Sequence, residues 1–252
     1  MTVNPGWSVA LALLILMAVS VGAYTVGRLP NIGQTVLAGT RAILQLSLAA
    51  LVIAAVITHL WASILLVCLM FAIAVGTTTR RVDARASWPW VALAMACGLL
   101  PVLVVVVATR TVPLTGIAVV PIAGILIGNT MNAHTLVGRR TFAALREERG
   151  QLEAGLSIGL PRPLAIAEVI HRRVPEALIP GLDQVRTAGV VTLPGAFIGV
   201  MLGGGTPAQA AAAQLLVLFG VMSAQTVTAV VGERLICAGR LLPADLVVSL
   251  PH

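Results

Sequence analysis

Long apolar runs separated by short polar stretches dominate the chain. Seven of these runs approach the ~20 residues that a helix needs to cross ~30 Å of hydrocarbon. Because lipid offers no hydrogen-bond partner to backbone N–H and C=O groups, each run is predicted to be a helix. The pattern therefore predicts an all-α, polytopic integral membrane protein with about seven transmembrane helices. They lie near residues 7–27, 36–57, 60–76, 89–108, 113–136, 187–204 and 208–231, with Trp7, Trp61, Trp88 and Trp90 at their ends.

The composition agrees with a membrane environment. Of the 252 residues, 58% are hydrophobic and 10% are charged, whereas a soluble domain has about 25% charged residues. A chain so poor in charge cannot cover a water-facing surface, so its main partner is predicted to be the lipid bilayer and not a nucleic acid. We expect residues 1–252 to form a single transmembrane permease domain.

The kind of charge also matters, because all 16 basic residues are Arg and the chain contains no Lys. A P-loop requires the Lys of G-x-x-x-x-G-K-[ST] to reach nucleotide phosphates. If ATP drives this protein, another polypeptide must bind it, and we expect this chain itself to bind no cofactor. The three cysteines are widely spaced without a C-x-x-C motif, so neither a disulfide framework nor a zinc site is indicated.

The arginines fall mainly in one of the two sets of connections between runs. Near His59 and Gly204 the other set contains only Arg110. Since cytoplasmic connections are enriched in Arg and Lys, the N-terminus is predicted outside and the C-terminus in the cytoplasm of a multi-pass cell-membrane protein. The predicted cytoplasmic arginines are Arg28, Arg80, Arg81, Arg85, those from Arg139 to Arg173, Arg234 and Arg240.

One long polar insert, residues 137–186, interrupts the apolar runs. A few residues would suffice to link two spans, whereas this insert is predicted to hold helices with one apolar side, which is typical of a docking surface for a soluble partner. Its Glu-Ala-Gly-x-x-x-Gly segment resembles the EAA-x-x-x-G loop with which ABC-importer permeases contact their ATPase, although the importer Ile-x-Leu-Pro is replaced by "VIHR". The residues predicted to couple to an ATPase are Glu153, Ala154, Gly155, Gly159, Pro161, Ile166 and Ile170.

Two other interpretations of the insert remain open. It can be a solvated connecting helix without a partner. Its "GLSIG" also matches G-x-S-x-G, the nucleophile elbow of hydrolases, but that motif requires a strand-to-helix turn, and the surrounding pattern is helical.

Polar residues inside the predicted spans are candidates for a translocation pathway. They are Arg41 and Gln45 in the second span and Asn129, Met131, Asn132 and His134 in the fifth. The alternatives are snorkelling of Arg41 to the head groups and helix-to-helix hydrogen bonding by the amides. All nine acidic residues lie in predicted loops or at span ends, which disfavours a proton- or sodium-coupled carrier because such carriers usually need a carboxylate at depth.

Small residues recur in the sixth predicted span at four-residue spacing. Gly195, Gly199 and Gly203 would let another helix approach closely. We predict helix packing here, either within one protomer or across a dimer.

Several separated motifs resemble one family. "RAILQL", "GNTMNA", "EAGLSIG" and the long segment beginning "VRTAGVVTLPGAFIG" are similar to the FetB-type permeases, membrane subunits of a small ABC transporter group associated with bacterial iron export and plant aluminium tolerance. The resemblance implies a separate ATPase subunit in two copies, which would bind ATP and Mg, and a homodimer of the permease. It also implies export of iron or another metal. Export of an organic anion such as a sugar nucleotide stays open, because the spans offer His, Met and Cys but no acid as metal ligands.

Overall fold

The computed structural model describes residues 6–56 and 58–249, in which all regular secondary structure is helical apart from an isolated bridge between Ala188 and Thr192. This confirms the predicted all-α fold. The chain divides into two compact units, Met1–Thr58 and His59–His252. The elements are α1 (Trp7–Val26), α2 (Ile32–Val56), α3 (Leu60–Arg81), the 3₁₀-helix η1 (Arg85–Ser87), α4 (Trp88–Ala108), α5 (Gly116–Glu147), α6 (Arg149–Ser157), α7 (Arg162–Ile170), α8 (Val174–Thr187), α9 (Gly195–Leu202), α10 (Pro207–Cys237) and α11 (Ala244–Ser249).

The first unit is a hairpin of α1 and α2. Arg28 and Asn31 adopt positive φ in the turn between them, at 49° and 78°. The helices meet where Met17 lies over Gly39, since a Cβ at Gly39 would come within 2.1 Å of the Met17 methyl carbon. None of the residues in the hydrophobic windows of α1 and α2 is buried, so nearly all of this apolar surface is available to lipid or to other protein surfaces.

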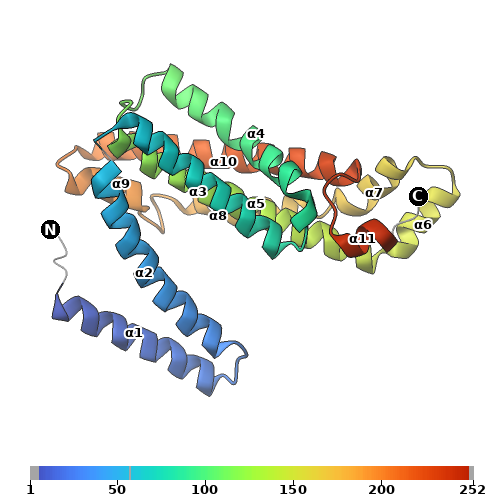
Figure 1. Cartoon of the computed structure of the whole chain (residues 1–252), viewed down its shortest axis with the longest axis horizontal. Helices are drawn as coiled ribbons and strands as arrows, with labels where there is room; N and C mark the ends of the chain where they lie inside the picture. The colour runs from blue at the N-terminus through green and yellow to red at the C-terminus, as the bar shows by residue number, and fades with distance from the viewer. Residues whose placement is uncertain (1–5, 57, 250–252) are drawn as a thin grey trace. The chain divides into compact units, whose positions relative to one another are not determined.

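The second unit is built around four long helices, α3, α4, α5 and α10, which run side by side in Figure 1. α10 packs against α4 and α5, and α3 packs against α5. α4 and α10 approach closely at Gly98 of α4, where a Cβ would lie 2.1 Å from Thr228 Oγ1 and 2.4 Å from the Ala224 carbonyl oxygen of α10. The largest fully buried side chains of this unit include Phe142, Met95, Leu126, Leu145, Leu152, Ile166, Ile170 and Ile236.

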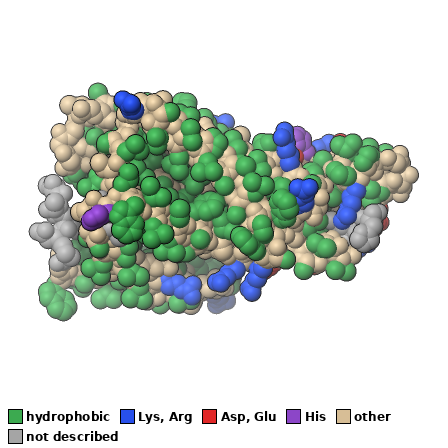
Figure 2. All heavy atoms as spheres, turned by 45° about the horizontal axis from the view of Figure 1, so that its top comes forward, with side chains coloured by type: hydrophobic (Ala, Val, Ile, Leu, Met, Phe, Trp, Pro, Cys, Tyr) green, Lys and Arg blue, Asp and Glu red, His purple; other side chains and the backbone are tan. Residues whose placement is uncertain are grey.

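Within the described part of the chain, six helices are long and apolar enough to span a membrane: α1, α2, α3, η1 with α4, α5 and α10. Figure 2 shows apolar side chains over much of the visible surface, and several basic and acidic side chains on the narrower end that carries α6 and α7. This segregation is expected when the two parts of a protein face different solvents.

The predicted transmembrane helix at 187–204 is wrong as a continuous helix. Only the eight-residue α9 forms there, after a bend at 188–194. Gly189 adopts a φ of +83°, and Pro194 both lacks an N–H and disfavours helical geometry in Leu193. The bend satisfies its own backbone, because Gly189 N–H donates to the Thr192 carbonyl and Thr192 N–H to the Thr187 carbonyl. The apolar composition of residues 187–204 therefore gave no indication that the helix is interrupted.

In place of the predicted continuous helix, α8 and α9 both pack along α10. Gly181 of α8 lies against Gln225, and the Phe197 N–H of α9 donates to Gln214 Oε1 at 3.3 Å. The two contacts run in antiparallel register along α10, which begins with a capping box at Thr206. From Thr206 to Gln225 an α-helix extends about 28 Å, so the broken α8–α9 segment follows nearly the full thickness of a hydrocarbon core.

Candidate functional site

A polar seam joins α5 to α10 inside the apolar bundle. Gln225 donates through Nε2 to Oδ1 of Asn129 at 3.3 Å and to its backbone carbonyl at 3.4 Å. The Asn129 amide in turn donates to the Ile125 carbonyl one turn earlier in α5. Gly181 leaves room for Gln225, since a Cβ there would come within 2.0 Å of Gln225 Oε1. Three helices thus converge on one pair of amides, the seam amides Asn129 and Gln225.

His134 also lies between α5 and α10 and is more completely buried than the seam amides. Its side chain is 1% exposed, and neither ring nitrogen has a hydrogen-bond partner among the described residues. It points toward α10, where a Cβ at Gly232 would lie 3.8 Å from His134 Nε2. The Thr228 hydroxyl of α10 is buried and likewise without a partner. A buried polar group without a partner is rare in folded proteins, which makes the His134 imidazole a candidate for contact with a ligand.

The other predicted pathway residues differ in burial and in the unit to which they belong. Met131 is half-buried and packs against the core, and Asn132 is exposed. Arg41 and Gln45 belong to α2 in the other unit, where both are exposed. With Gln34, which precedes Arg41 by seven residues, they form a polar stripe on one face of α2. No Asp or Glu occurs in residues 1–58, so the Arg41 guanidinium has no carboxylate partner within its own unit.

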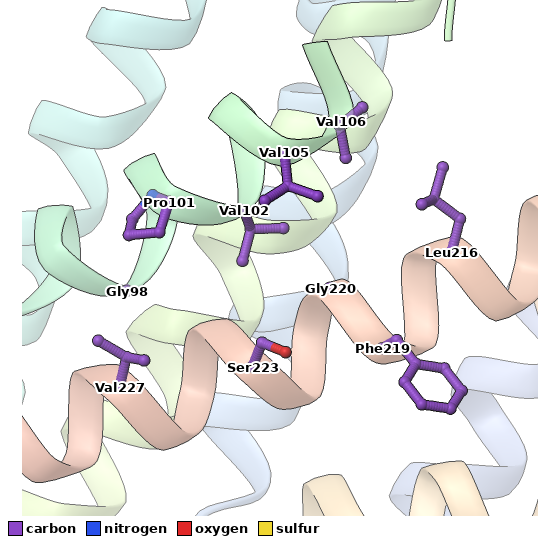
Figure 3. A pocket seen from close by; sticks show the side chains of 10 residues that line it. All are labelled: Gly98, Pro101, Val102, Val105, Val106, Leu216, Phe219, Gly220, Ser223 and Val227. Carbon is purple, nitrogen blue, oxygen red and sulfur yellow. The ribbon is translucent and has the colours of Figure 1, made fainter. Parts of the chain in front are cut away.

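Two hollows border α10, and both are mainly apolar. The smaller, about 260 Å³, lies between α4 and α10 beside Pro101, with the Ser223 hydroxyl on its α10 side (Figure 3). The larger, about 1070 Å³, is an open hollow lined by the start of α5, by α9 and by α10, with Gly199 and Gln209 among its lining residues. Such walls suit acyl chains or apolar side chains better than a hydrated ion.

The predicted glycine stripe borders the larger hollow. A Cβ added to Gly195 or Gly199 would meet no atom within 4 Å, and one at Gly203 would approach only carbonyls of its own helix. Among the described residues of the second unit, no other helix therefore packs closely on this stripe. Packing against a second copy stays a prediction. Glycines of the second unit that do lie close to another element include Gly98, Gly138 and Gly181.

The predicted coupling residues occupy a hairpin of α6 and α7. Glu153 is exposed and pairs with Arg149 at 2.9 Å, and Ala154 is exposed beside it. Gly155 faces α7, because a Cβ there would lie 3.5 Å from the Ala165 Cβ. Gly159 makes the turn with a φ of +88° and has open space around it. Pro161 follows the turn and precedes the first residue of α7.

The tip of this hairpin and its base differ in burial. Ile158 at the tip is 81% exposed and Leu164 is 55% exposed. Ile166 and Ile170 are fully buried in the core of the second unit together with residues of α5 and α10. They therefore fasten the hairpin to the bundle, and the tip carries its free apolar surface.

Charged pairs reinforce this attachment. Arg173, just before α8, donates to Glu148 at 2.7 Å, and Arg140 of α5 pairs with Glu176 of α8. The neighbouring Glu148 raises the pKa of Arg173. On α10, Glu233 contacts His171 Nδ1 at 2.7 Å. The base of the hairpin is thus tied to both α5 and α10.

The C-terminal segment closes the same end of the bundle. Asp245 of α11 accepts from Arg146 Nε at 2.8 Å, and this hydrogen bond lowers the pKa of the Asp245 carboxyl. Leu241, Leu242 and Leu246 are buried beside it. α11 therefore holds the end of α5 from which the hairpin departs.

Comparison with known proteins identifies the family. A profile described as "Uncharacterised protein family (UPF0014)" matches residues 7–239. The chain belongs to this family. The UPF0014 membrane protein STAR2 of Oryza sativa subsp. japonica is 30% identical over 230 residues, which are 90% of this chain and 80% of the relative. No solved structure matches the chain.

Two further relatives of this UPF0014 chain have names that describe a role. The Probable iron export permease protein FetB of Escherichia coli (strain K12) is 30% identical over 129 residues, 51% of this chain and 50% of the relative. Protein ALUMINUM SENSITIVE 3 of Arabidopsis thaliana is 26% identical over 206 residues, 81% of this chain and 76% of the relative. These matches confirm the predicted family and the multi-pass membrane location.

The seam of this UPF0014 member was only half visible in the sequence. Asn129 and His134 stand out because they interrupt an apolar run. Gln225 is equally polar, but nothing in its local pattern assigns it to Asn129, which is 96 residues away. Gly181 gives no signal at all, since it sits in a polar insert. Only the antiparallel course of α8 along α10 brings it to the seam.

Proposed function

We propose that this chain is the membrane subunit of an ATP-driven ABC transporter, with ATP and Mg bound by a separate ATPase subunit. The observation that carries the proposal is the α6–α7 hairpin, whose exposed apolar tip contrasts with a base buried among the transmembrane helices. A partner that binds the tip at Ile158 can displace the hairpin, and the buried contacts of Ile166 and Ile170 can transmit this displacement to α5 and α10. The UPF0014 relatives, one named a permease, support this assignment.

The assembly we propose contains two copies of this chain and two ATPase subunits. Each chain forms a single permease domain that crosses the membrane seven times, and the broken α8–α9 segment is the sixth crossing. The N-terminus then lies outside and the hairpin and C-terminus in the cytoplasm. A reporter fused after His252 should read out as cytoplasmic, and one inserted near Ala62 as external. The opposite pair of results would exclude this orientation.

Gly159 offers a sharp test of the docking hypothesis. Its positive φ is tolerated by Gly and, among other residues, best by Asn. Because the space around Gly159 is open, Gly159→Asn should preserve the turn and still place a side chain on the docking surface. Overpacking a tight interface costs about 1–3 kcal/mol, so we expect co-purification of the ATPase to fall by about one order of magnitude or more.

The matched control is Glu153→Ala, which removes an exposed ion pair worth ~0–1 kcal/mol and should weaken assembly only slightly. Both variants should insert into the membrane and unfold at the wild-type temperature. Wild-type ATPase binding and wild-type coupled ATP hydrolysis by Gly159→Asn would remove the hairpin tip from the mechanism.

For the substrate, we propose export of iron or another transition metal. The relative named as an iron export permease supports this choice, and the unpartnered His134 imidazole has the donor chemistry of a borderline metal ligand. Among the described residues no group of three or more His, Cys, Asp or Glu is placed to hold a metal ion. A transported metal would accordingly be bound weakly and briefly, as movement of α5 against α10 exposes the seam.

A second candidate is an organic anion such as a sugar nucleotide, and one observation favours it. Arg41 projects from α2 on a polar stripe with no acid in its unit to neutralise it. Stimulation of ATP hydrolysis in reconstituted vesicles separates the candidates. Ferrous iron should stimulate the wild type and lose its effect in His134→Leu. Stimulation by a sugar nucleotide, lost in Arg41→Gln, would replace the metal proposal.

A further inference from the structure

Three arginines without carboxylate partners among the described residues belong to the end of α3 or contact it. Arg80 and Arg81 are the last residues of α3, and both are exposed. Arg139 of α5 reaches this end of α3, because its Nε donates to the Arg81 carbonyl at 3.3 Å. We call Arg80, Arg81 and Arg139 the arginine cluster. None of the three takes part in an ion pair among residues 6–56 and 58–249.

The neighbouring arginines of α5, unlike the arginine cluster, form ion pairs. Arg140, the next residue in α5, pairs with Glu176, and Arg146 two turns later pairs with Asp245. Asp83 follows α3 in the chain, but it forms no ion pair with any described residue, and its charge acts on Arg146. The fold thus neutralises the arginines of α5 that face α8 and α11 and leaves the one that faces α3 positive.

The cluster lies at the depth of a membrane surface. From Leu60 to Arg80, α3 extends about 30 Å, and from Gly116 to Arg139, α5 extends about 35 Å. Both lengths match or slightly exceed the ~30 Å hydrocarbon core. The two helices therefore bring their arginines to the same boundary. Trp88, which begins α4 beside η1, is 60% exposed, as a ring in the head-group region would be.

Three unpaired positive charges at one end of α3 attract anions, and the position of the cluster indicates which anion is available there. Arg presents planar, rigidly spaced N–H donors that suit phosphate oxygens. Within the described residues, Arg139 uses only its Nε–H in a hydrogen bond, so its terminal N–H groups are available to a phosphate. A lipid phosphate is present at this boundary at high local concentration, whereas a soluble phosphate must arrive from bulk water. We propose that the arginine cluster binds the phosphate of an anionic phospholipid at the hairpin end of the bundle.

Affinity for a fluorescent phosphatidylglycerol, measured on the purified chain in zwitterionic detergent micelles, tests the assignment. Each Arg near a membrane surface contributes about fivefold to the binding of anionic lipid. Arg80→Gln, which removes no hydrogen bond or ion pair among the described residues, should weaken binding by about fivefold, and Arg80→Gln with Arg81→Gln by about twentyfold to thirtyfold. Phosphatidylcholine should bind the wild type and both variants with the same low affinity.

Arg149→Gln is the matched control, because it removes the same charge from an exposed arginine that is paired with Glu153 in α6. It should bind phosphatidylglycerol like the wild type. Equal losses in Arg149→Gln and Arg80→Gln would show that only net charge matters and overturn the site. Displacement of the lipid by equimolar inorganic phosphate would overturn the lipid as ligand. ATPase co-purification by the Arg80→Gln variant should be unchanged, so failure here leaves the proposed function intact.

Discussion

The contact between α4 and α10 at Gly98 gives a stability prediction that can be worked from the structure. In Gly98→Ala the new Cβ would lie 2.1 Å from Thr228 Oγ1 and 2.4 Å from the Ala224 carbonyl oxygen. The hydroxyl can rotate away, but the carbonyl belongs to the backbone of α10. The helices must therefore separate by several tenths of an ångström or more, and overpacking of this kind costs about 1–3 kcal/mol.

Replacing Gly by Ala inside a helix also has a favourable effect of about 1 kcal/mol, because it restricts the unfolded chain and improves helix propensity. The net loss expected for Gly98→Ala is thus about 1 kcal/mol and at most ~2 kcal/mol. For a chain of this size, 1 kcal/mol corresponds to a Tm change of about 2–4 °C. Thermal unfolding of the detergent-solubilised protein, followed by intrinsic Trp fluorescence, measures the shift.

Gly76→Ala in α3 is the control, because a Cβ at that position meets nothing within 4 Å. It should raise the Tm slightly, since only the favourable helix effect remains. Adding Thr228→Ala to Gly98→Ala should recover only part of the loss, because the Ala224 carbonyl stays in place. A Gly98→Ala protein as stable as the wild type, or one rescued fully by Thr228→Ala, would refute the close approach of the two backbones.

Two further changes test the seam and the closing of the bundle end. His134→Leu should keep or slightly raise the Tm, because it replaces a buried imidazole that has no hydrogen-bond partner with an apolar side chain of similar size. Substrate-stimulated ATP hydrolysis should fall in the same variant. A clear drop in Tm would show that the imidazole is hydrogen-bonded in the folded protein. Asp245→Asn should lower stability by at most ~1 kcal/mol, because the pair with Arg146 is exposed. Since the folded-state pKa of Asp245 is lowered, its contribution is present above the unfolded pKa of ~3.9 and disappears as the pH falls below it. The difference in Tm between wild type and Asp245→Asn should therefore vanish in acid, and a difference that persists there would contradict the ionic origin.

The features that the sequence could predict are those set by local chemistry. Lipid allows only helices, so long apolar runs suffice to place α1 to α5 and α10. The helix that failed, at 187–204, has the same composition but contains Gly189 and Pro194, whose backbone preferences outweigh hydrophobicity.

The features that could not be predicted depend on partners far apart in the chain. The pattern alone placed Ile166 and Ile170 on the apolar side of a short helix, but it could not decide between a partner protein and the bundle. Burial against α5 and α10 decides for the bundle. In the same way, Arg139 and Arg140 are adjacent and chemically identical, and only the positions of α3 and α8 make one a free charge and the other half of an ion pair.

The hairpin and the seam are parts of the same two helices, and this connection gives the proposed transport cycle its mechanical basis. α5 runs without interruption from Asn129 to Glu147, a distance of about 27 Å, and α10 carries both Gln225 and Glu233, which contacts His171 at the base of the hairpin. A partner that displaces the hairpin must therefore shift α5 and α10 relative to each other or break their ties to it. The contact between the seam amides is weak, with hydrogen bonds of 3.3 and 3.4 Å, and interhelical hydrogen bonds of this kind in membranes average about 0.6 kcal/mol. In the proposed cycle, movement of α5 against α10 would break these two hydrogen bonds and open the seam. Opening there uncovers the one imidazole within the described spans that has no partner to lose.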